Sequence, residues 1–225
     1  MRSVELFIFP LLLLVIVFSG CLETPVAAPP HIDENVLEEC GWVQIGDSTS
    51  RSKTFDIGGK EIKINTATIN YGDKSLEEYL MRQVGEYSNV ENISTARIVA
   101  MRIVLPAGIP LPSQVVLEMA STQVKDMAVR MNIKDFHKIN TTQLPLKNGK
   151  TAEANVYSGY TTLGNNNVPL KGMIATWGAS GSTLVVTAVY PDKDFVFEAG
   201  TKKVIINIDG KAEYKEIIKL LQHIE

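Results

Sequence analysis

The fold class of this chain is decided by residues 182–190, Ser-Thr-Leu-Val-Val-Thr-Ala-Val-Tyr, the strongest β-forming stretch of the sequence. The turn sequence Gly178-Ala-Ser-Gly181 stands directly before it and follows another strand-like run, Val168 to Trp177. Two apolar runs joined by a short glycine-containing segment are typical of an antiparallel hairpin. We therefore expect these residues to form two neighbouring strands of a sheet.

Two more strand-like runs precede this hairpin. They cover residues 136–146 and 151–163, and Asn148-Gly149 between them is a strong signal for a type I′ turn. The turn sequence Gly164-Asn-Asn-Asn167 connects the second run to the hairpin. The four runs predict an antiparallel meander.

The amino-terminal half predicts further strands. Residues 42–57 have the pattern of one strand or a pair of short strands, and Gly58-Gly59 is a hairpin signal before the alternating run 60–71. Residues 95–105 predict a mostly buried strand, and residues 203–208 are a candidate for the last one. We expect a mainly antiparallel, twisted sheet of about 6–8 strands.

Helices are predicted around this sheet, and the longest begins at Ser113. Its apolar stripe is interpreted as core, with a methionine-lined ligand groove as the alternative, and consists of Val116, Ala120, Val124, Met127 and Met131. The other helices are expected at residues 33–40, from the capping box Ser75-Leu-Glu-Glu78 to about Val84, and from about Lys211 onwards. The sum is a single α+β domain over residues 32–225, with helices packed on the faces of its sheet.

The charges of the chain nearly cancel, with 22 Lys and Arg residues against 25 Asp and Glu residues and a net charge of −3. A nucleic-acid binder needs a surplus of clustered Lys and Arg to neutralise phosphates. The densest basic stretch, Lys125 to Lys138, is interrupted by Asp126 and Asp135. We therefore expect no nucleic-acid partner.

The amino-terminus has the architecture of a signal peptide. Residues 6–18 are an uncharged apolar run preceded by Arg2 and followed by small residues. As a helix the run would rise only about 20 Å, against roughly 30 Å for a bilayer core, and Pro10 weakens it further. We interpret residues 1–20 as a cleaved signal rather than a permanent membrane span.

The end of this run, Phe18-Ser-Gly-Cys21, resembles the lipobox of prokaryotic lipoproteins, although Phe18 replaces the usual leucine. The resemblance implies that Cys21 becomes the new amino-terminus and carries a lipid anchor, palmitate or another lipid, on the outer face of the cell membrane. Residues 21–31 would then be the lipidated cysteine and a proline-rich, semi-rigid spacer that holds the domain away from the bilayer.

Two other uses of the cysteines remain open. Cys21 could follow an ordinary signal peptide, or it could form a disulfide with Cys40, which is incompatible with lipidation. Cys40 shares its register with apolar residues of a short helix, so we interpret it as a buried small residue. The sequons at Asn92 and Asn140 are candidate glycosylation sites if the host glycosylates its surface.

No motif specifies a reaction. The three histidines, His31, His137 and His223, lack metal-ligand spacing, and no cofactor-binding loop is present, so no metal or cofactor is expected. The segment Gly178-Ala-Ser-Gly-Ser182 only approaches the nucleophile-elbow pattern. A hydrolase with a dispersed site would draw on Ser180, Ser182 and His137 as candidates, and the catalytic residues remain unknown.

The order of these features resembles a family of archaeal membrane lipoproteins of unknown function. The shared features are the lipobox cysteine, the short helix followed by glycine, the Gly-Gly hairpin, the central helix, the glycine-turn meander and the Val-Thr-Ala-Val-Tyr-Pro strand end. More distantly the arrangement is similar to the PsbP/Mog1-like fold, whose members are mostly non-catalytic. The resemblance implies a non-catalytic accessory or binding module for an envelope protein or a small apolar ligand. The alternatives are a cell-envelope hydrolase and a purely structural envelope component.

Overall fold

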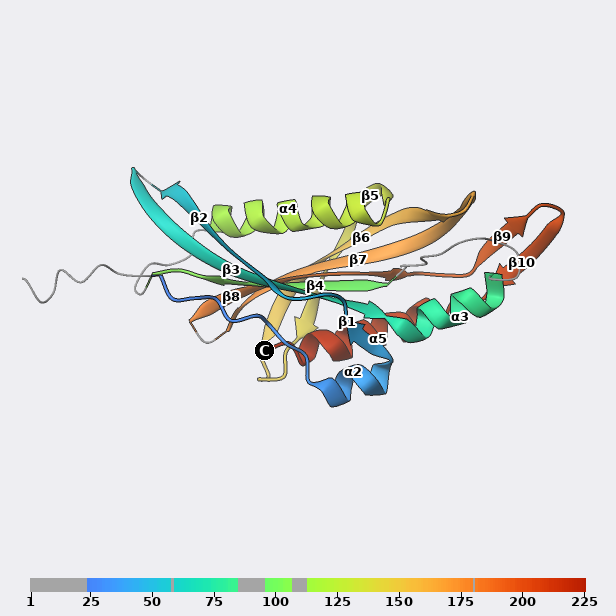
Figure 1. The fold of residues 1–225 in the computed structure, drawn as a ribbon, viewed down its shortest axis with the longest axis horizontal. Helices are drawn as coiled ribbons and strands as arrows, with labels where there is room; N and C mark the ends of the chain where they lie inside the picture. The colour runs from blue at the N-terminus through green and yellow to red at the C-terminus, as the bar shows by residue number, and fades with distance from the viewer. Residues whose placement is uncertain (1–23, 58, 85–95, 107–112, 180) are drawn as a thin grey trace, which may run out of the picture.

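The computed structural model describes residues 24–57, 59–84, 96–106, 113–179 and 181–225, and these residues form an eight-stranded antiparallel sheet, a two-stranded sheet and four helices (Figure 1). The strands are β1 Trp42–Gln44, β2 Thr49–Ile57, β3 Lys60–Asp73, β4 Arg97–Val104, β5 Lys134–Pro145, β6 Thr151–Leu163, β7 Asn166–Ala179, β8 Ser182–Pro191, β9 Phe195–Ala199 and β10 Lys202–Ile206. The helices are α2 Glu34–Cys40, α3 Lys74–Val84, α4 Ser113–Arg130 and α5 Gly210–Gln222.

The predicted meander is confirmed. The large sheet has the order β1-β3-β4-β8-β7-β6-β5, and β2 pairs with β3 beside β1. β8 lies in the middle, where Val186 is opposite Ala100 of β4 on one side and Ala175 of β7 on the other. Residues 42–57 form two short strands, as one of the two interpretations predicted.

The carboxy-terminal strand prediction needs a correction. Residues 202–206 are a strand, but β10 pairs with β9 in a separate two-stranded sheet and adds nothing to the large one. No strand was predicted at residues 195–199, where β9 lies. Its Phe195 and Phe197 are buried while Val196 between them is exposed, and this alternation stabilises a strand packed on one side.

Alternate residues of the central strands face two different layers of helices. On β8, Leu184 and Val186 belong to the main core that includes α5, whereas Val185 belongs to a second core that includes Val115 and Ala120 of α4. Figure 1 shows α4 alone on one side of the sheet and α2, α3 and α5 on the other. The prediction that helices cover the faces of the sheet is therefore confirmed, with one face covered by a single helix.

The cap of α3 differs from the prediction. The capping box assigned the amino-terminal cap to Ser75, but α3 begins at Lys74 and the carboxylate of Asp73 accepts a hydrogen bond of 2.8 Å from the backbone N–H of Leu76. Asp73 ends β3 and is only 4% exposed. A buried carboxylate that already faces the free N–H groups of the first turn replaces the serine as the cap.

The proline-rich segment was expected to be an extended spacer between the bilayer and the domain, and several of its described residues pack against the sheet. The Asn65 amide donates to the carbonyls of Thr24 and Pro25, at 3.0 and 2.8 Å, and the Arg102 guanidinium donates to Ala28 at 3.0 Å. Ala27 is 2% exposed. Proline removes backbone donors but leaves carbonyls free, and side-chain donors of β3 and β4 bind those carbonyls.

Candidate functional site

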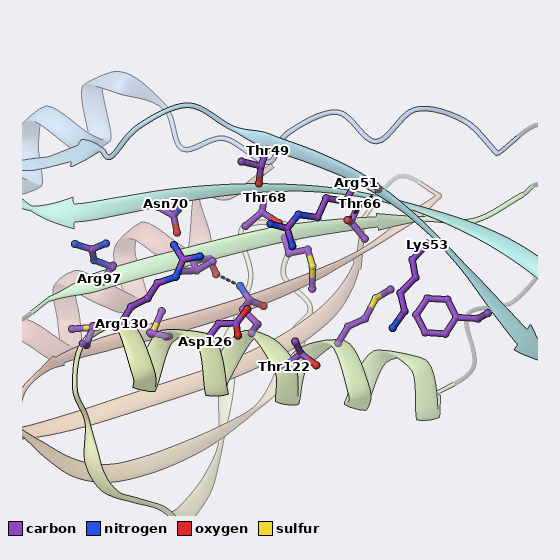
Figure 2. Close-up of a pocket in the computed structure, with 17 residues that line it drawn as sticks. Thr49, Arg51, Lys53, Thr66, Thr68, Asn70, Arg97, Thr122, Asp126 and Arg130 are labelled. Carbon is purple, nitrogen blue, oxygen red and sulfur yellow. Dashed lines mark hydrogen bonds between the residues drawn. The ribbon is translucent and has the colours of Figure 1, made fainter.

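A groove lies between α4 and the strands β2, β3 and β4, and it encloses a cavity of about 290 Å³. Figure 2 shows its side chains converging from the helix and from the three strands. The residues that line it are Thr49, Arg51, Lys53, Phe55, Thr66, Thr68, Asn70, Arg97, Val99, Met101, Met119, Thr122, Gln123, Asp126, Met127, Arg130 and Met131.

The strand register explains why residues distant in sequence meet here. Thr68 of β3 is opposite Thr49 of β2 and opposite Met101 of β4. Because side chains alternate across a sheet, every second residue along these strands points to the same side. Thr66 and Asn70 therefore accompany Thr68, and the α4 side of this part of the sheet carries hydroxyl, amide and cationic groups.

The helix contributes a row of residues spaced by four: Met119, Gln123, Met127 and Met131. Residues four apart lie above one another on one face of a helix. Met127 and Met131 are buried, at 4% and 7% exposure, and belong to the main core as well as to the groove. Met127 and Met131 are therefore both core residues and groove-lining residues, so both interpretations of the methionine stripe apply to them.

Gln123 lies in the middle of this row with one half of its amide unused. Its Nε2 donates a hydrogen bond of 2.8 Å to the carbonyl of Val99, drawn as a dashed line in Figure 2. Its Oε1 is buried and has no hydrogen-bond partner among the described residues, although the side chain is only 8% exposed. A buried acceptor without a donor costs about 1–3 kcal/mol. A ligand that donates a hydrogen bond here would recover that free energy.

Cations surround the groove. Arg51 and Lys53 come from β2, Arg97 from β4 and Arg130 from the end of α4, and Asp126 is the one acidic residue among the described lining residues. The Lys53 ammonium lies 4.5 Å from the centre of the Phe55 ring, an arrangement that lowers its energy.

Arg97 is the most buried of these cations. Burial lowers the pKa of the Arg97 guanidinium, the carboxylate of Glu77 opposes this shift, and the positive charge of Arg130 reinforces it. Because Arg130 and Arg97 interact unfavourably, an anion between them would lower the energy of both.

A second groove, with a cavity of about 650 Å³, lies on the other side of α4. Phe136 and Tyr157 are stacked in its wall, with ring centres 5.0 Å apart and planes 10° from parallel. Gly172 leaves room for this pair, because a Cβ on Gly172 would lie 2.6 Å from Cζ of Phe136. Val116, Ala120 and Val124, which were predicted to share a stripe with the methionines, face this groove instead.

An acidic cluster occupies the opposite face of the sheet, beside Cys40. The Trp42 indole donates to Glu216 at 2.6 Å, and burial raises the pKa of Asp73 and of Glu213 to about 7 each. Neighbouring carboxylates contribute to both of these raised pKa values, after burial. Burial also raises the pKa of the Cys40 thiol, which is half-buried against the core as a free cysteine. The thiol is therefore kept in its unreactive protonated form.

Two of the three residues predicted for a hydrolase site, His137 and Ser182, are described by the structure, and they lie far apart. His137 of β5 is opposite Ser158, which is opposite Lys171, which in turn is opposite Tyr190. Ser182 is eight residues from Tyr190 along β8. His137 and Ser182 are therefore separated by three inter-strand spacings, about 14 Å, and by roughly 26 Å along the strands. They do not form a nucleophile and base pair.

The local bonds of these residues agree with a structural role. The Ser182 hydroxyl donates to the Ala179 carbonyl at 2.5 Å and accepts from Arg102 at 3.1 Å. Nδ1 of His137 lies 2.7 Å from the Asp135 carbonyl. Asn140 is exposed on β5. Cys21, Asn92 and Ser180, which were also predicted as site residues, lie outside the described residues.

Several residues of the α4 groove escaped the sequence analysis. Arg51 and Arg97 belong to different strands, and only the pairing through β3 brings them to one face. A signal did exist for Gln123, because it interrupts a row of methionines at a spacing of four. A polar residue inside an apolar helical stripe is a candidate for a buried contact.

A family model described as a domain of unknown function (DUF6517) matches residues 29–225. No curated protein and no solved structure matches the chain. The match spans α2 to α5 and both grooves. Among the described residues, no helix combines the length and the apolar character needed to cross a membrane.

Proposed function

Since this chain belongs to the family described as a domain of unknown function (DUF6517), we propose its function from its own residues. It is a non-catalytic binding module that holds a small ligand with an apolar part in the groove between α4 and the strands β2 to β4. A lipid anchor at Cys21 places it on the outer face of the cell membrane.

The observation that supports ligand binding most directly is the unpartnered Oε1 of Gln123 inside a groove with methionines. Methionine is flexible and polarizable, so a methionine-rich surface adapts to apolar ligands of different shapes. Ligand sites combine an apolar lining with a few polar groups that orient the ligand. The groove has this composition, and Gln123 supplies a buried acceptor that no described residue pairs.

The anchor proposal rests on the signal-like run, on the lipobox-like Cys21 and on the resemblance to archaeal membrane lipoproteins. The first described residue, Thr24, donates a hydrogen bond of 2.9 Å to the carbonyl of Lys63 on β3. Three residues span at most about 11 Å, so a lipid on Cys21 would hold this part of β3 close to the bilayer. Thr54, opposite Lys63, is next to both Lys53 and Phe55 of the groove.

The distant similarity to PsbP/Mog1-like proteins agrees with a non-catalytic role. The hydrolase alternative gains no support from Ser182 and His137, because the sheet register separates them. A partner protein of the envelope remains a second candidate ligand. The two grooves on either side of α4 favour a small molecule, since each is a concave cavity.

The groove can be tested with the full chain in phosphatidylcholine nanodiscs, labelled with carbon-13 at the methionine methyl groups. 1-Octanol serves as the apolar probe. We expect its titration to shift, in a saturable manner, the methyl resonances of the groove residues Met101, Met119, Met127 and Met131. Met81 on α3 and Met173, which belongs to the main core, do not line the groove and should not shift.

A pair of variants separates groove binding from partition into the lipid. Thr68→Phe fills the groove from β3 and should abolish the shifts. Thr54→Phe makes the same change at an exposed position that does not line the groove, and it should leave the shifts unchanged. Equal shifts of all methionines, or equal behaviour of the two variants, would contradict the proposed site.

The anchor has its own test. Mass spectrometry of the chain extracted from membranes should show an amino-terminus at Cys21 that carries lipid, and Cys21→Ser should release the protein from the membrane fraction. An unmodified Cys21 thiol in the extracted chain would overturn the anchor and leave the groove proposal untouched.

A further inference from the structure

We infer that the ligand of the α4 groove is an anionic amphiphile: an acidic head group bound by the arginines at the rim, with a hydrocarbon chain on the methionines. This inference rests on the proposed binding function and specifies the chemical class of the ligand. The shared chemistry of the class is a phosphate monoester or carboxylate that carries an apolar tail.

Charge is the first argument. The described residues of the groove lining include four cations and one carboxylate, 4 − 1 = +3, whereas the whole chain has a net charge of −3. The cations thus gather on one surface against the overall sign of the protein. A positively charged groove raises the local concentration of anions and attracts them at long range.

The type of cation is the second argument. Arg51 and Arg130 are exposed at the rim, and neither forms an ion pair with another described residue. A guanidinium group offers a planar fork of donors that matches the oxygens of a carboxylate or a phosphate. Figure 2 shows the side chains of Arg51 and Arg130 between the strands and α4, on opposite sides of the groove.

The floor of the groove explains why the ligand must also have a tail. Met101 and Met119 are partly buried, and Met127 is almost fully buried below them. An inorganic anion would leave this apolar surface in water and would gain nothing from it. A hydrocarbon chain would bury it, at about 0.8 kcal/mol per methylene group as an upper guide.

Gln123 adds a condition on the head group. Its Oε1 accepts hydrogen bonds and cannot bind a deprotonated acid, which offers acceptors only. The unpartnered Oε1 therefore selects a ligand with a hydroxyl or amide donor near the acidic group. The Thr68 hydroxyl on the facing strand can donate to the same region of the ligand, whereas the Thr66 hydroxyl donates to the Arg51 carbonyl at 3.3 Å and can only accept.

The experiment compares three probes on the labelled full chain in phosphatidylcholine nanodiscs: octyl phosphate, 1-octanol and inorganic phosphate. We expect octyl phosphate to shift the groove methionines at a concentration at least about tenfold lower than 1-octanol does, because charge-assisted contacts to two arginines outweigh the single hydrogen bond that the octanol hydroxyl can donate to Gln123. Inorganic phosphate should leave the methionine methyl groups unshifted.

The arginines are tested with the double variant Arg51→Gln/Arg130→Gln and with the matched control Arg82→Gln, an exposed arginine on α3 away from the groove. The double variant should weaken binding of octyl phosphate about tenfold and leave binding of 1-octanol unchanged. The control should change neither. Thermal unfolding of each variant identifies any loss of fold.

The outcomes separate the two proposals. If 1-octanol and octyl phosphate bind equally well and the double variant has no effect, the ligand class is wrong and the binding groove stands. If octyl phosphate binds equally to the double variant and the control, the arginines are not the head-group site. If neither amphiphile shifts the groove methionines, both the binding function and its ligand class fall. Shifts with inorganic phosphate alone would identify a simple anion site and overturn the amphiphile.

Discussion

The two faces of the central sheet are made by the same strands and differ in how they are covered. The face toward α2, α3 and α5 is closed by three helices and carries an acidic cluster. The face toward α4 is crossed by one helix with a groove on each side of it and carries cations. The comparison teaches that alternate residues of one strand serve stability on one side and are available for binding on the other.

The largest expected effect of this difference is on stability. Ile98 and Met101 lie three residues apart on β4, with Ile98 fully buried against the α5 side and Met101 partly buried in the groove. We expect Ile98→Ala to lower the free energy of unfolding by about 2–5 kcal/mol and Met101→Ala by about 1 kcal/mol or less.

Urea unfolding of both variants measures this contrast, because the two positions share a strand and similar volumes. Equal losses of unfolding free energy would mean that the α4 face is as well packed as the other face. Looser packing of the α4 face could then not explain the groove between α4 and the strands.

The acidic cluster lies on the face that α2, α3 and α5 cover, and it predicts that the stability of the protein depends on pH. Burial raises the folded-state pKa of Asp73 and Glu213 to about 7, above an unfolded value of about 4. Between these values the folded state binds more protons than the unfolded state, so stability must fall as pH rises from about 4 to 7 and then level off. The slope is at most about 1.4 kcal/mol per pH unit for each group.

Asp73→Asn tests this slope, since asparagine can still cap α3 but cannot ionise. We expect its unfolding midpoint in urea to depend less on pH than that of the natural chain, with the larger gain in stability at pH 7.5. A variant with an unchanged pH profile would show that Asp73 does not titrate in this range. The arrangement of Trp42, Glu216 and Glu213 around Asp73 would then need an explanation other than a shared effect on the pH dependence of stability.

A smaller effect is expected at the second groove. In Gly172→Ala the added methyl group would lie 2.6 Å from the Phe136 ring, so the ring must leave its stack on Tyr157. The ring is half-exposed and can move, and we expect a loss of about 1–2 kcal/mol together with a change of the near-ultraviolet circular dichroism of the aromatic residues. Gly178→Ala, where a Cβ meets nothing within 4 Å, is the matched control and should keep both signals.

The sequence predicted the strands well where alternation and turn residues agree. Asn148-Gly149 and Gly59 fall between paired strands, and both glycines have a positive φ, 76° at Gly149 and 77° at Gly59. The turn type at Asn148-Gly149 was predicted wrongly, because a type I′ turn needs a positive φ at both central residues and Asn148 does not have one.

The other errors lie where a tertiary contact overrides a local signal. Asp73 replaces Ser75 as the cap because β3 ends there and the Asp73 carboxylate binds the first turn of α3. The contacts of the proline-rich segment with Asn65 and Arg102 carry no local signal, because they join residues 41 and 74 positions apart.

The candidate site was only partly predictable, for a physical reason. The methionines of α4 follow from helical spacing, but the cations opposite them depend on the register between β2, β3 and β4. A shift of one residue in that register would turn Arg51 to the other face. No feature within either segment alone carries that information.

The smallest expected effect on stability concerns the rim of the open face. Arg51 and Arg130 are exposed, and exposed side chains without special contacts change stability by about 0.5 kcal/mol or less. We therefore expect Arg51→Gln/Arg130→Gln to leave the urea midpoint nearly unchanged while it weakens octyl phosphate binding. A large loss of stability in this variant would mean that the rim arginines stabilise the fold. The conclusion that the α4 face is available for binding and contributes little to stability would then be wrong at the groove.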